Sequence, residues 1–146
     1  MYRVLVPIDT DEARARVQAE AVAALPNASE EVQADLLYVY EEIDAAPDEA
    51  GDFYIDEINK NLGEYQGMPD TIDLAVELLE GADVETAVHD VTGEPAAAIL
   101  EIADEFDADS IVLGSRRRSP VGKVLFGSVT QAVILDSDRP VMVVPT

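Results

Sequence analysis

Short apolar runs recur along the chain and predict β-strands that are buried within a sheet. Most of these runs are nearly continuous rather than alternating, which is typical of strands covered on both faces. Pro7 falls near the end of the first run, where the missing N–H group of proline does not interrupt strand pairing. The five runs lie at residues 2–8, 32–40, 84–88, 110–113 and 141–144.

Between these runs, apolar residues recur every three or four positions, which predicts amphipathic helices. We expect the first helix to begin at a capping box formed by Asp9 and Glu12. Pro95 is expected in the first turn of a later helix, and the last helix is expected to begin at the Ser119–Pro120 pair. The positions predicted to face inward are Ala13, Val17, Ala21, Ala24 and Leu25; Tyr54, Ile58, Leu62 and Tyr65; Ile72, Ala75, Val76 and Leu79; Ile99, Ile102, Ala103 and Phe106; and Val121, Val124, Leu125, Ser128, Ala132 and Leu135.

The alternation of strands and helices predicts a parallel sheet with helices on both faces, and the length of 146 residues predicts one domain, 1–146. Right-handed crossovers leave only a few doubly wound strand orders. In such folds, ligands bind at the carboxyl ends of the strands, where the winding reverses. The order 3-2-1-4-5 would place this reversal between the first and fourth strands and bring the Asp9 loop beside the Gly114 loop.

The composition is strongly acidic, with 31 Asp and Glu residues against 9 Lys and Arg residues and a net charge of −22. Molar salt shortens the Debye length to about 3 Å and screens the repulsion between carboxylates. We therefore predict a protein of an extreme halophile, the alternative being an ordinary acidic protein. This charge also argues against binding to nucleic acid, which needs a broad basic face.

Several kinds of site are excluded by the residue types that the chain lacks. It has no cysteine and one histidine, which excludes disulfides, thiolate metal sites and multi-histidine metal sites. We expect His89 to face solvent or the sheet surface rather than to act as a pH-sensitive ligand. No signal peptide is visible and no apolar run approaches the roughly 18 residues that span a bilayer, so we expect a cytoplasmic protein that does not bind membranes.

The few cations are concentrated toward the C-terminus. Residues 111–146 hold five of the nine basic residues and only two acidic ones, and residues 116–123 hold four of the cations. This basic loop follows a strand ending at Gly114 and leads into the last helix, whose opening turns are predicted to contain Gly122, Gly127 and Ser128. Backbone N–H groups at a helix N-terminus attract anions, which favours a phosphate site. A solvated loop that offsets acidic surroundings explains the charge equally well.

These segments resemble the universal stress protein family, and the resemblance covers nearly the whole chain. It rests on residues 4–9, 37–40 and 93–95 and on the last segment, from 111–114 through 127–129 to 140–144. The nucleotide motif of that family is Gly, two residues, Gly, nine residues, Gly, then Ser or Thr. Gly114, Gly127 and Ser128 match this spacing, whereas Arg117 stands in place of the second glycine.

The resemblance implies a stress-associated, ATP-binding protein with the adenine nucleotide alpha hydrolase-like fold, a doubly wound five-stranded parallel sheet of order 3-2-1-4-5. It implies that Pro7 and Asp9 lie against adenine and ribose, and that Val39 contacts adenine through its backbone. Gly114 would let the backbone approach the sugar and phosphates, and residues 127–129 would donate to phosphate oxygens. The predicted site for ATP, with or without Mg²⁺, comprises Pro7, Asp9, Thr10, Val39, Gly114, Ser115, Arg116, Arg117, Gly127, Ser128 and Val129.

The same residues leave alternatives open. Arginine resists the positive φ and close approach that glycine permits, so Arg117 can block the loop. Arginine is also a strong bidentate phosphate donor, so Arg117 can equally replace the lost glycine as a ligand. Asp9 has a structural explanation as a helix cap, and Gly127 and Ser128 have one as residues that let the helix pack closely on the sheet.

Three functions follow from this reading, in decreasing order of support. The first is a nucleotide-dependent dimeric module, in which the apolar edge strand 141–144 pairs with its copy in a second chain. The second is a dimeric adaptor that binds no nucleotide and works through protein contacts. The third is an enzyme, at most a slow ATPase with Asp9 holding Mg²⁺. No catalytic or metal-ligating residues are predicted, because the chain offers no Ser-His-Asp set and no Walker lysine motif.

Overall fold

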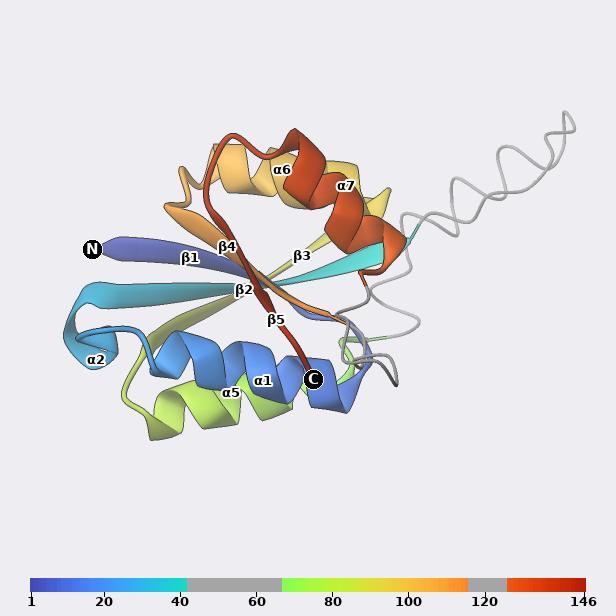
Figure 1. Cartoon of the computed structure of the whole chain (residues 1–146). Helices are drawn as coiled ribbons and strands as arrows, with labels where there is room; N and C mark the ends of the chain where they lie inside the picture. Colours follow the sequence, from blue (N-terminus) through green and yellow to red (C-terminus); the bar gives the residue numbers. More distant parts are fainter. Residues whose placement is uncertain (42–66, 116–125) are drawn as a thin grey trace, which may run out of the picture.

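The computed structural model describes residues 1–41, 67–115 and 126–146, which form a parallel β-sheet between two layers of helices (Figure 1). The predicted helix at residues 54–65 and the predicted start of the last helix at residues 119–125 lie outside these ranges. The strands are β1 (Tyr2–Pro7), β2 (Val32–Glu41), β3 (Glu85–Gly93), β4 (Ser110–Gly114) and β5 (Val141–Val144). The helices are α1 (Glu12–Ala23), α2 (Ala28–Glu31), α5 (Asp70–Gly81), α6 (Pro95–Glu105) and α7 (Ser128–Asp136).

The strand order is β3-β2-β1-β4-β5, and every pairing is parallel, which confirms the predicted doubly wound sheet. The two sides of β1 differ in how far they pair. Toward β2, pairing runs along the whole strand, from Tyr2 opposite Val32 to Pro7 opposite Leu37. Toward β4, only Val4 and Leu5 have partners. The sheet therefore begins to divide between β1 and β4, as expected where the winding reverses.

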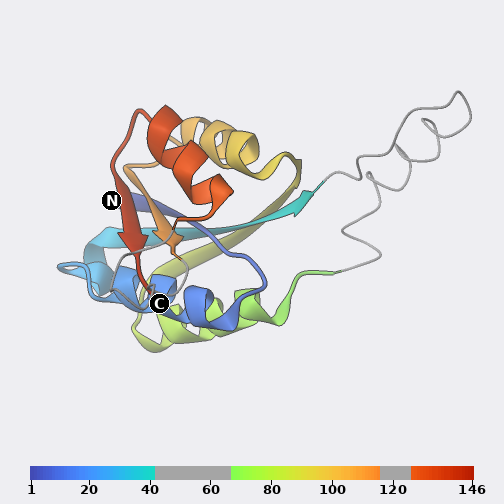
Figure 2. The same ribbon diagram turned by 45° about the vertical axis from the view of Figure 1, so that its right-hand side comes forward.

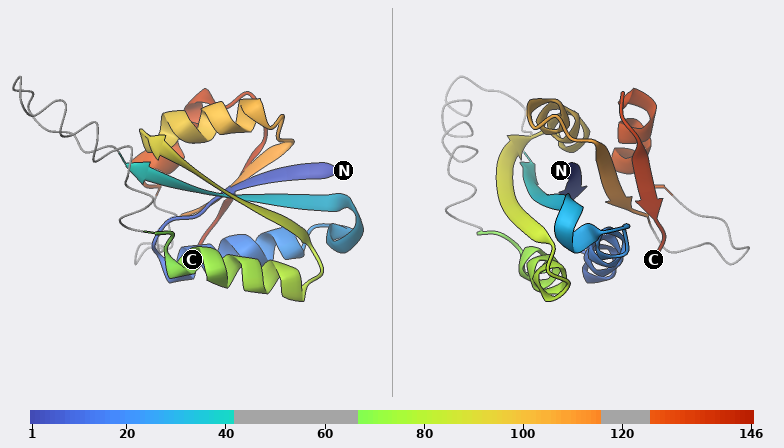
Figure 3. Two further views of the ribbon diagram at one scale, coloured as in Figure 1. Left: turned by 180° about the vertical axis from the view of Figure 1, so that it is seen from behind. Right: turned by 90° about the vertical axis from the view of Figure 1, so that its left-hand side faces the viewer.

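Each face of the sheet is covered by two helices, α1 and α5 on one side and α6 and α7 on the other (Figures 2 and 3). Side chains alternate between faces along a strand, so neighbours in β1 belong to different cores. Val4 and Val6 pack with α1 and α5, whereas Leu5 packs with α6 and α7. Burial on both faces explains why the inner strands β1, β2 and β4 are nearly continuous apolar runs, whereas the edge strand β3 alternates.

The inward face of α1 differs from the predicted one. Ala13 and Ala24 are exposed, whereas the buried residues of the helix are Ala15, Gln18, Ala19 and Val22. Alanine stands on all sides of this helix, so its hydrophobic pattern does not single out one face and contacts with the sheet decide the orientation. The predicted cap is also wrong: the N-cap is Asp11, whose side chain accepts a hydrogen bond from the Arg14 backbone N–H at 2.9 Å.

The last helix begins later than predicted. Residues 126 and 127 are not helical, Gly127 is the N-cap, and α7 starts at Ser128. Thr130 and Val133 are its buried residues, whereas Ser128 is exposed and the Leu135 side chain is 77% exposed, contrary to the predicted inward face. The sequence of α7 is apolar on nearly all sides, so periodicity again fails to identify the packed side.

The remaining elements agree closely with the pattern. The helix at Asp70–Gly81 and the Ile99, Ile102 and Ala103 stripe of α6 are as predicted, with Pro95 in the first turn and the Glu94 carboxylate capping it. β3 extends beyond residue 88 to Gly93, because β2 offers pairing partners up to Glu41. Within the described ranges, no helix combines the length and apolar character needed to cross a bilayer.

Candidate functional site

A crevice opens at the carboxyl ends of the strands, where β1 and β4 separate. β1 and β2 run toward the right-hand side of Figure 1. The Gln18 side chain of α1 fixes the inner end of the crevice. Its Nε2 donates to the Pro7 carbonyl oxygen at 2.6 Å and to the Val112 carbonyl oxygen at 3.0 Å. The side chain is 2% exposed, so one amide group satisfies two carbonyls on strands that no longer pair at this level.

The crevice contains a cavity of about 560 Å³, which lies within the size range of small-molecule sites. One part of its wall is apolar, supplied by the end of β2, the start of α6 and the end of β4. The residues of this part are Leu37, Val39, Pro95, Ile99 and Leu113. The other part is polar and includes Asp9, Thr10 and Arg14. An amphiphilic ligand, apolar at one end and charged at the other, fits such a wall.

A smaller cavity of about 180 Å³ shares several lining residues with the first and extends the polar part toward α7. It is lined by Asp9, Arg14, Gly114, Gly127, Ser128, Val129 and Thr130. The first N–H groups of a helix have no acceptor within the helix, and the N-cap Gly127 has no side chain to supply one. The positive end of the α7 dipole therefore faces this cavity, which favours an anion there.

Asp9 is held in place by hydrogen bonds at both its carboxylate and its backbone. Oδ1 accepts from the Asp11 backbone N–H at 2.9 Å, and Oδ2 accepts from Arg14 Nε at 2.8 Å. The Thr71 hydroxyl of α5 donates to the Asp9 carbonyl oxygen. The Asp9 side chain remains 53% exposed, so its carboxylate stays accessible to a ligand in the crevice.

Gly114, at the end of β4, has a packing reason to be glycine. A Cβ atom at this position would lie 2.9 Å from Arg14 Cβ and 3.0 Å from Arg14 Cγ. The Arg14 side chain thus runs directly over the Gly114 backbone. Gly114 was predicted to let a ligand approach its backbone closely. In the structure, the Arg14 side chain of α1 is a close neighbour of that backbone.

The predicted site residues are largely brought together. Those that line one or both cavities are Pro7, Asp9, Thr10, Val39, Gly114, Gly127, Ser128 and Val129. Ser115 lines neither cavity: it is buried, and its backbone N–H donates to the Val144 carbonyl oxygen at 2.9 Å. Arg116 and Arg117 lie outside the described residues, as do Arg118 and Lys123.

Sequence reasoning missed two polar residues of α1 that shape the crevice, Arg14 and Gln18. Each carried a signal: Arg14 is one helical turn beyond the cap, and Gln18 is a polar residue between apolar positions. Neither signal could be used, because the buried face of α1 was assigned incorrectly. Tyr40, at the end of β2, also lines the cavity. Burial raises the pKa of its hydroxyl, with smaller contributions from Asp90 and Tyr38, so the hydroxyl remains a donor at neutral pH.

A second polar cluster lies near the opposite end of β1 and centres on Asp35, which is 1% exposed. Arg3 Nε donates to Asp35 Oδ2 at 2.7 Å, and His89 Nε2 lies 3.0 Å from Asp35 Oδ1. The Phe106 ring packs against both partners of Asp35, with its centroid 4.9 Å from Arg3 Cζ and 4.5 Å from the His89 ring. His89 therefore lies on the sheet surface, one of the two locations predicted for it. Within the described residues, no group of three His, Cys, Asp or Glu side chains is arranged to hold a metal ion.

Comparison with known proteins gives the same picture of the whole chain. A model described as the universal stress protein family matches residues 1–145. A universal stress protein from Thermus aquaticus is 30% identical over 126 residues, which cover 86% of this chain and 89% of that protein. The stress response protein NhaX of Bacillus subtilis is 44% identical over 52 residues. This match covers 36% of this chain and 31% of NhaX.

Solved structures share the fold. The MJ0577 protein of Methanocaldococcus jannaschii superposes with a TM-score of 0.76 at 26% identity, covering 99% of this chain and 96% of that one. The universal stress protein of Archaeoglobus fulgidus, solved in complex with dAMP, gives a TM-score of 0.62 at 23% identity and covers 98% and 97% of the two chains. The fold is therefore the adenine nucleotide alpha hydrolase-like fold, as predicted.

Proposed function

The chain belongs to the universal stress protein family, and on that premise we propose that it binds an adenine nucleotide, ATP, in the crevice between β1 and β4. The observation that supports this best is the division of the cavity wall. Val39, Ile99 and Leu113 offer an apolar surface for a purine ring, while the α7 N-terminus offers N–H groups to phosphate. The related protein of Archaeoglobus fulgidus, solved with dAMP, supports the same ligand class.

In this proposal, Asp9 and Thr10 form hydrogen bonds with the ribose hydroxyls, because both line the larger cavity and Asp9 also lines the smaller one. Gly127, Ser128 and Val129 donate to phosphate oxygens. When Mg²⁺ accompanies ATP, the accessible Asp9 carboxylate is a protein ligand for it. Residues 1–146 act as one cytoplasmic domain of the stress response, with ligand binding rather than catalysis as its task.

The first test denatures the purified protein and identifies any released ligand by mass spectrometry. The second test measures ATP binding by calorimetry in molar KCl, with and without Mg²⁺. Val39→Trp places an indole in the apolar part of the cavity and should abolish binding. Val88→Trp is the matched control, because Val88 is an exposed residue of β3 that does not line the cavity. Equal heats for wild type and both variants would show that ATP does not bind in this crevice.

Arg117 is tested directly by two substitutions. If Arg117 is a phosphate ligand, Arg117→Ala should weaken ATP binding by about ten- to a hundredfold, which corresponds to the loss of one charge-assisted hydrogen bond. If Arg117 blocks the loop, Arg117→Gly should create or strengthen binding. No heat from the wild type combined with tight binding by the glycine variant would favour the adaptor over the nucleotide-binding protein.

The dimer is a separate part of the proposal. β5 is an edge strand of the sheet, and apolar side chains are exposed on it and on neighbouring α7, at Met142, Ile134 and Leu135. An uncovered apolar edge favours pairing with a second copy, here β5 against β5. Val143→Asp should weaken this dimer, as measured by light scattering in molar KCl. A wild-type monomer at micromolar concentration would rule it out.

The acidic composition supports a halophilic origin as a further proposal. With a net charge of −22, repulsion between carboxylates opposes folding unless salt screens it. The melting temperature should rise steeply with KCl concentration into the molar range. A melting temperature that is flat above about 0.1 M, where the Debye length is already about 10 Å, would instead identify an ordinary acidic protein.

A further inference from the structure

Arg14 stands where the two cavities of the crevice meet. It lines both of them, together with Asp9, Gly114, Val129 and Thr130. Among the described residues, it is the only Arg or Lys that lines either cavity. The other charged side chains of the wall, Asp9 and Glu41, are carboxylates that disfavour an anion. Among the described side chains of the cavity wall, Arg14 is therefore the one that can offset the negative charge of a bound phosphate.

Most of the hydrogen-bonding capacity of this guanidinium is unused by the part of the chain that the structure describes. A guanidinium carries five N–H donors. Within the described residues, Arg14 uses the one on Nε, which donates to Asp9 Oδ2 at 2.8 Å. Its Nη2 lies 3.8 Å from Asp11 Oδ2, an ion-pair distance that is too long for a hydrogen bond. The edge formed by Nη1 and Nη2 is thus available to bind two oxygens of one anion.

The side chain is also held in a fixed position before any ligand arrives. Its aliphatic part lies on Gly114, at the contact distances that leave no room for a Cβ there. Its Nε is anchored by Asp9, and Asp9 is itself fixed by the Asp11 backbone N–H and the Thr71 hydroxyl. Fixing a long side chain in advance removes most of the entropy cost of ordering it on binding.

We infer that Arg14 binds the ligand phosphate that lies next to the ribose, opposite the N–H groups at the start of α7. This inference rests on the proposed function and deepens it: Arg14 is the residue by which the crevice distinguishes a nucleotide from a nucleoside. Asp9 has the complementary task of keeping Arg14 oriented through Nε. The smaller cavity, whose lining includes both Arg14 and residues 127–130, receives the phosphate.

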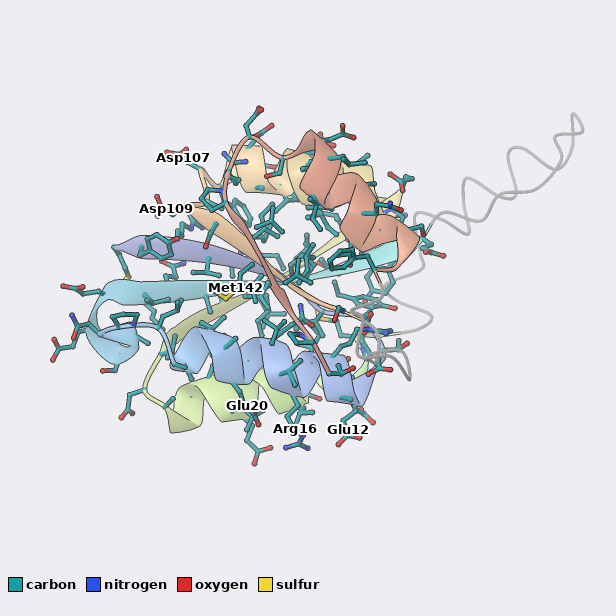
Figure 4. All side chains as sticks on the ribbon, in the orientation of Figure 1. Glu12, Arg16, Glu20, Asp107, Asp109 and Met142 are labelled. Carbon is teal, nitrogen blue, oxygen red and sulfur yellow. The ribbon has the colours of Figure 1, made fainter. Side chains whose placement is uncertain are left out.

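The experiment compares AMP with adenosine, two ligands that differ only in this phosphate. Calorimetry in molar KCl is carried out on the wild type, Arg14→Met, Arg14→Lys and Arg16→Met. Methionine keeps the aliphatic contact with Gly114 and removes every N–H donor. Arg16 is the matched control, since it projects from the outer face of α1 beside Glu12 and Glu20 (Figure 4) and pairs with Glu12 at 3.2 Å. Circular dichroism and the melting temperature establish that each variant is folded.

The wild type should bind AMP more tightly than adenosine. Arg14→Met should weaken AMP binding by about ten- to a hundredfold and leave adenosine binding within about twofold, because one charge-assisted contact is lost. Arg14→Lys should lie between the two, since it keeps the charge but not the bidentate edge, and Arg16→Met should match the wild type. Unchanged AMP affinity in Arg14→Met, or an equal loss for AMP and adenosine, overturns the inference alone. A folded wild type that binds neither ligand overturns the proposed function and the inference with it.

Discussion

Two Arg–Asp pairs lie at opposite ends of β1 and look alike by distance. Arg3 Nε is 2.7 Å from Asp35 Oδ2 at the start of the strand, and Arg14 Nε is 2.8 Å from Asp9 Oδ2 beyond its end. Their surroundings differ. Asp35 is 1% exposed and also contacts His89 and Gln33, whereas Asp9 is 53% exposed. The first pair lies within the packed sheet, and the second lies in the crevice.

The difference teaches that burial and unused donors, rather than pair distance, separate a structural ion pair from a ligand site. Arg3 uses Nε and Nη2 for Asp35 and Nη1 for the Phe106 carbonyl oxygen. It also packs over the Phe106 ring, so three of its five N–H donors and one face of its guanidinium are occupied. Arg14 uses one donor among the described residues. The first arrangement stabilises the fold, and the second leaves an edge for a ligand.

The largest expected effect comes from breaking the buried pair. Arg3→Met leaves the buried Asp35 carboxylate without its main partner, which should lower the free energy of unfolding by about 3 kcal/mol, the lower end of the range for a buried pair, because the Arg3 side chain is itself 34% exposed. The same change at Arg14 should cost less than about 1 kcal/mol, because Asp9 can be hydrated. Urea unfolding in molar KCl measures both. Equal losses for Arg3→Met and Arg14→Met would contradict the distinction between the two ends of β1.

The next largest destabilisation should come from removing the Gln18 side-chain amide at the inner end of the crevice. Gln18→Met deprives the Pro7 and Val112 carbonyl oxygens of their shared donor. Each orphaned group costs about 1–3 kcal/mol when water cannot reach it, and water in the cavity can reach Pro7, so we expect a total loss of about 2–3 kcal/mol. Gln131→Met, at an exposed position of α7, is the control and should be nearly neutral. A neutral Gln18→Met would mean that the two strands are held together without this side chain.

A smaller loss should follow from adding one methyl group beneath Arg14. Gly114→Ala places a Cβ within 3 Å of the Arg14 side chain and should lower stability by about 1–2 kcal/mol through overpacking. It should also weaken AMP binding by moving the guanidinium. Gly81→Ala is the matched control, because a Cβ at Gly81 has no described neighbour within 4 Å; its effect should be neutral or slightly stabilising. Thermal unfolding and calorimetry give the two readouts, and a neutral Gly114→Ala would refute the packing argument.

The smallest expected effect is the change with acid pH in the contribution of Asp35 to the free energy of unfolding. Burial alone would raise the pKa of the Asp35 carboxyl, but hydrogen bonds from Arg3 and His89 together with their charges outweigh it, so its pKa lies below the ordinary value. Such a group stabilises the folded state above the unfolded pKa of about 4, and this contribution is lost as the pH falls through the lower folded pKa.

Asp35→Asn removes that contribution. Its destabilisation relative to the wild type should shrink below about pH 4. The change should be at most about 1.4 kcal/mol per pH unit, the limit for one proton. The measurement is the free energy of unfolding against pH for both proteins in molar KCl. Parallel curves down to about pH 2 would show that the Asp35 pKa is not lowered by folding.

Part of the candidate site could be predicted from strand ends and part only from the family resemblance. The strand order alone predicts that the Asp9 and Gly114 loops lie together, and both residues line the larger cavity. Pro7 and Val39 also line it, but they were implied by the resemblance to the universal stress protein family. Motif spacing added Gly127 and Ser128, which line the smaller cavity. Arg14 and Gln18 could not be found in this way. Their roles depend on which face of α1 meets the sheet, and the alanine-rich pattern of that helix does not encode it.

The sequence by itself determined the parts of this protein that depend on local periodicity: the strands, the burial of the inner strands on both faces, and the alternation that requires a parallel doubly wound sheet. Only the tertiary structure decided the polar contacts between distant residues. Gln18 reaches Val112 across 94 positions, and Arg3 pairs with Asp35 across 32. The physical reason is that a hydrogen bond depends on angstrom-scale placement of two side chains, whereas a hydrophobic stripe requires only that one side of an element be apolar.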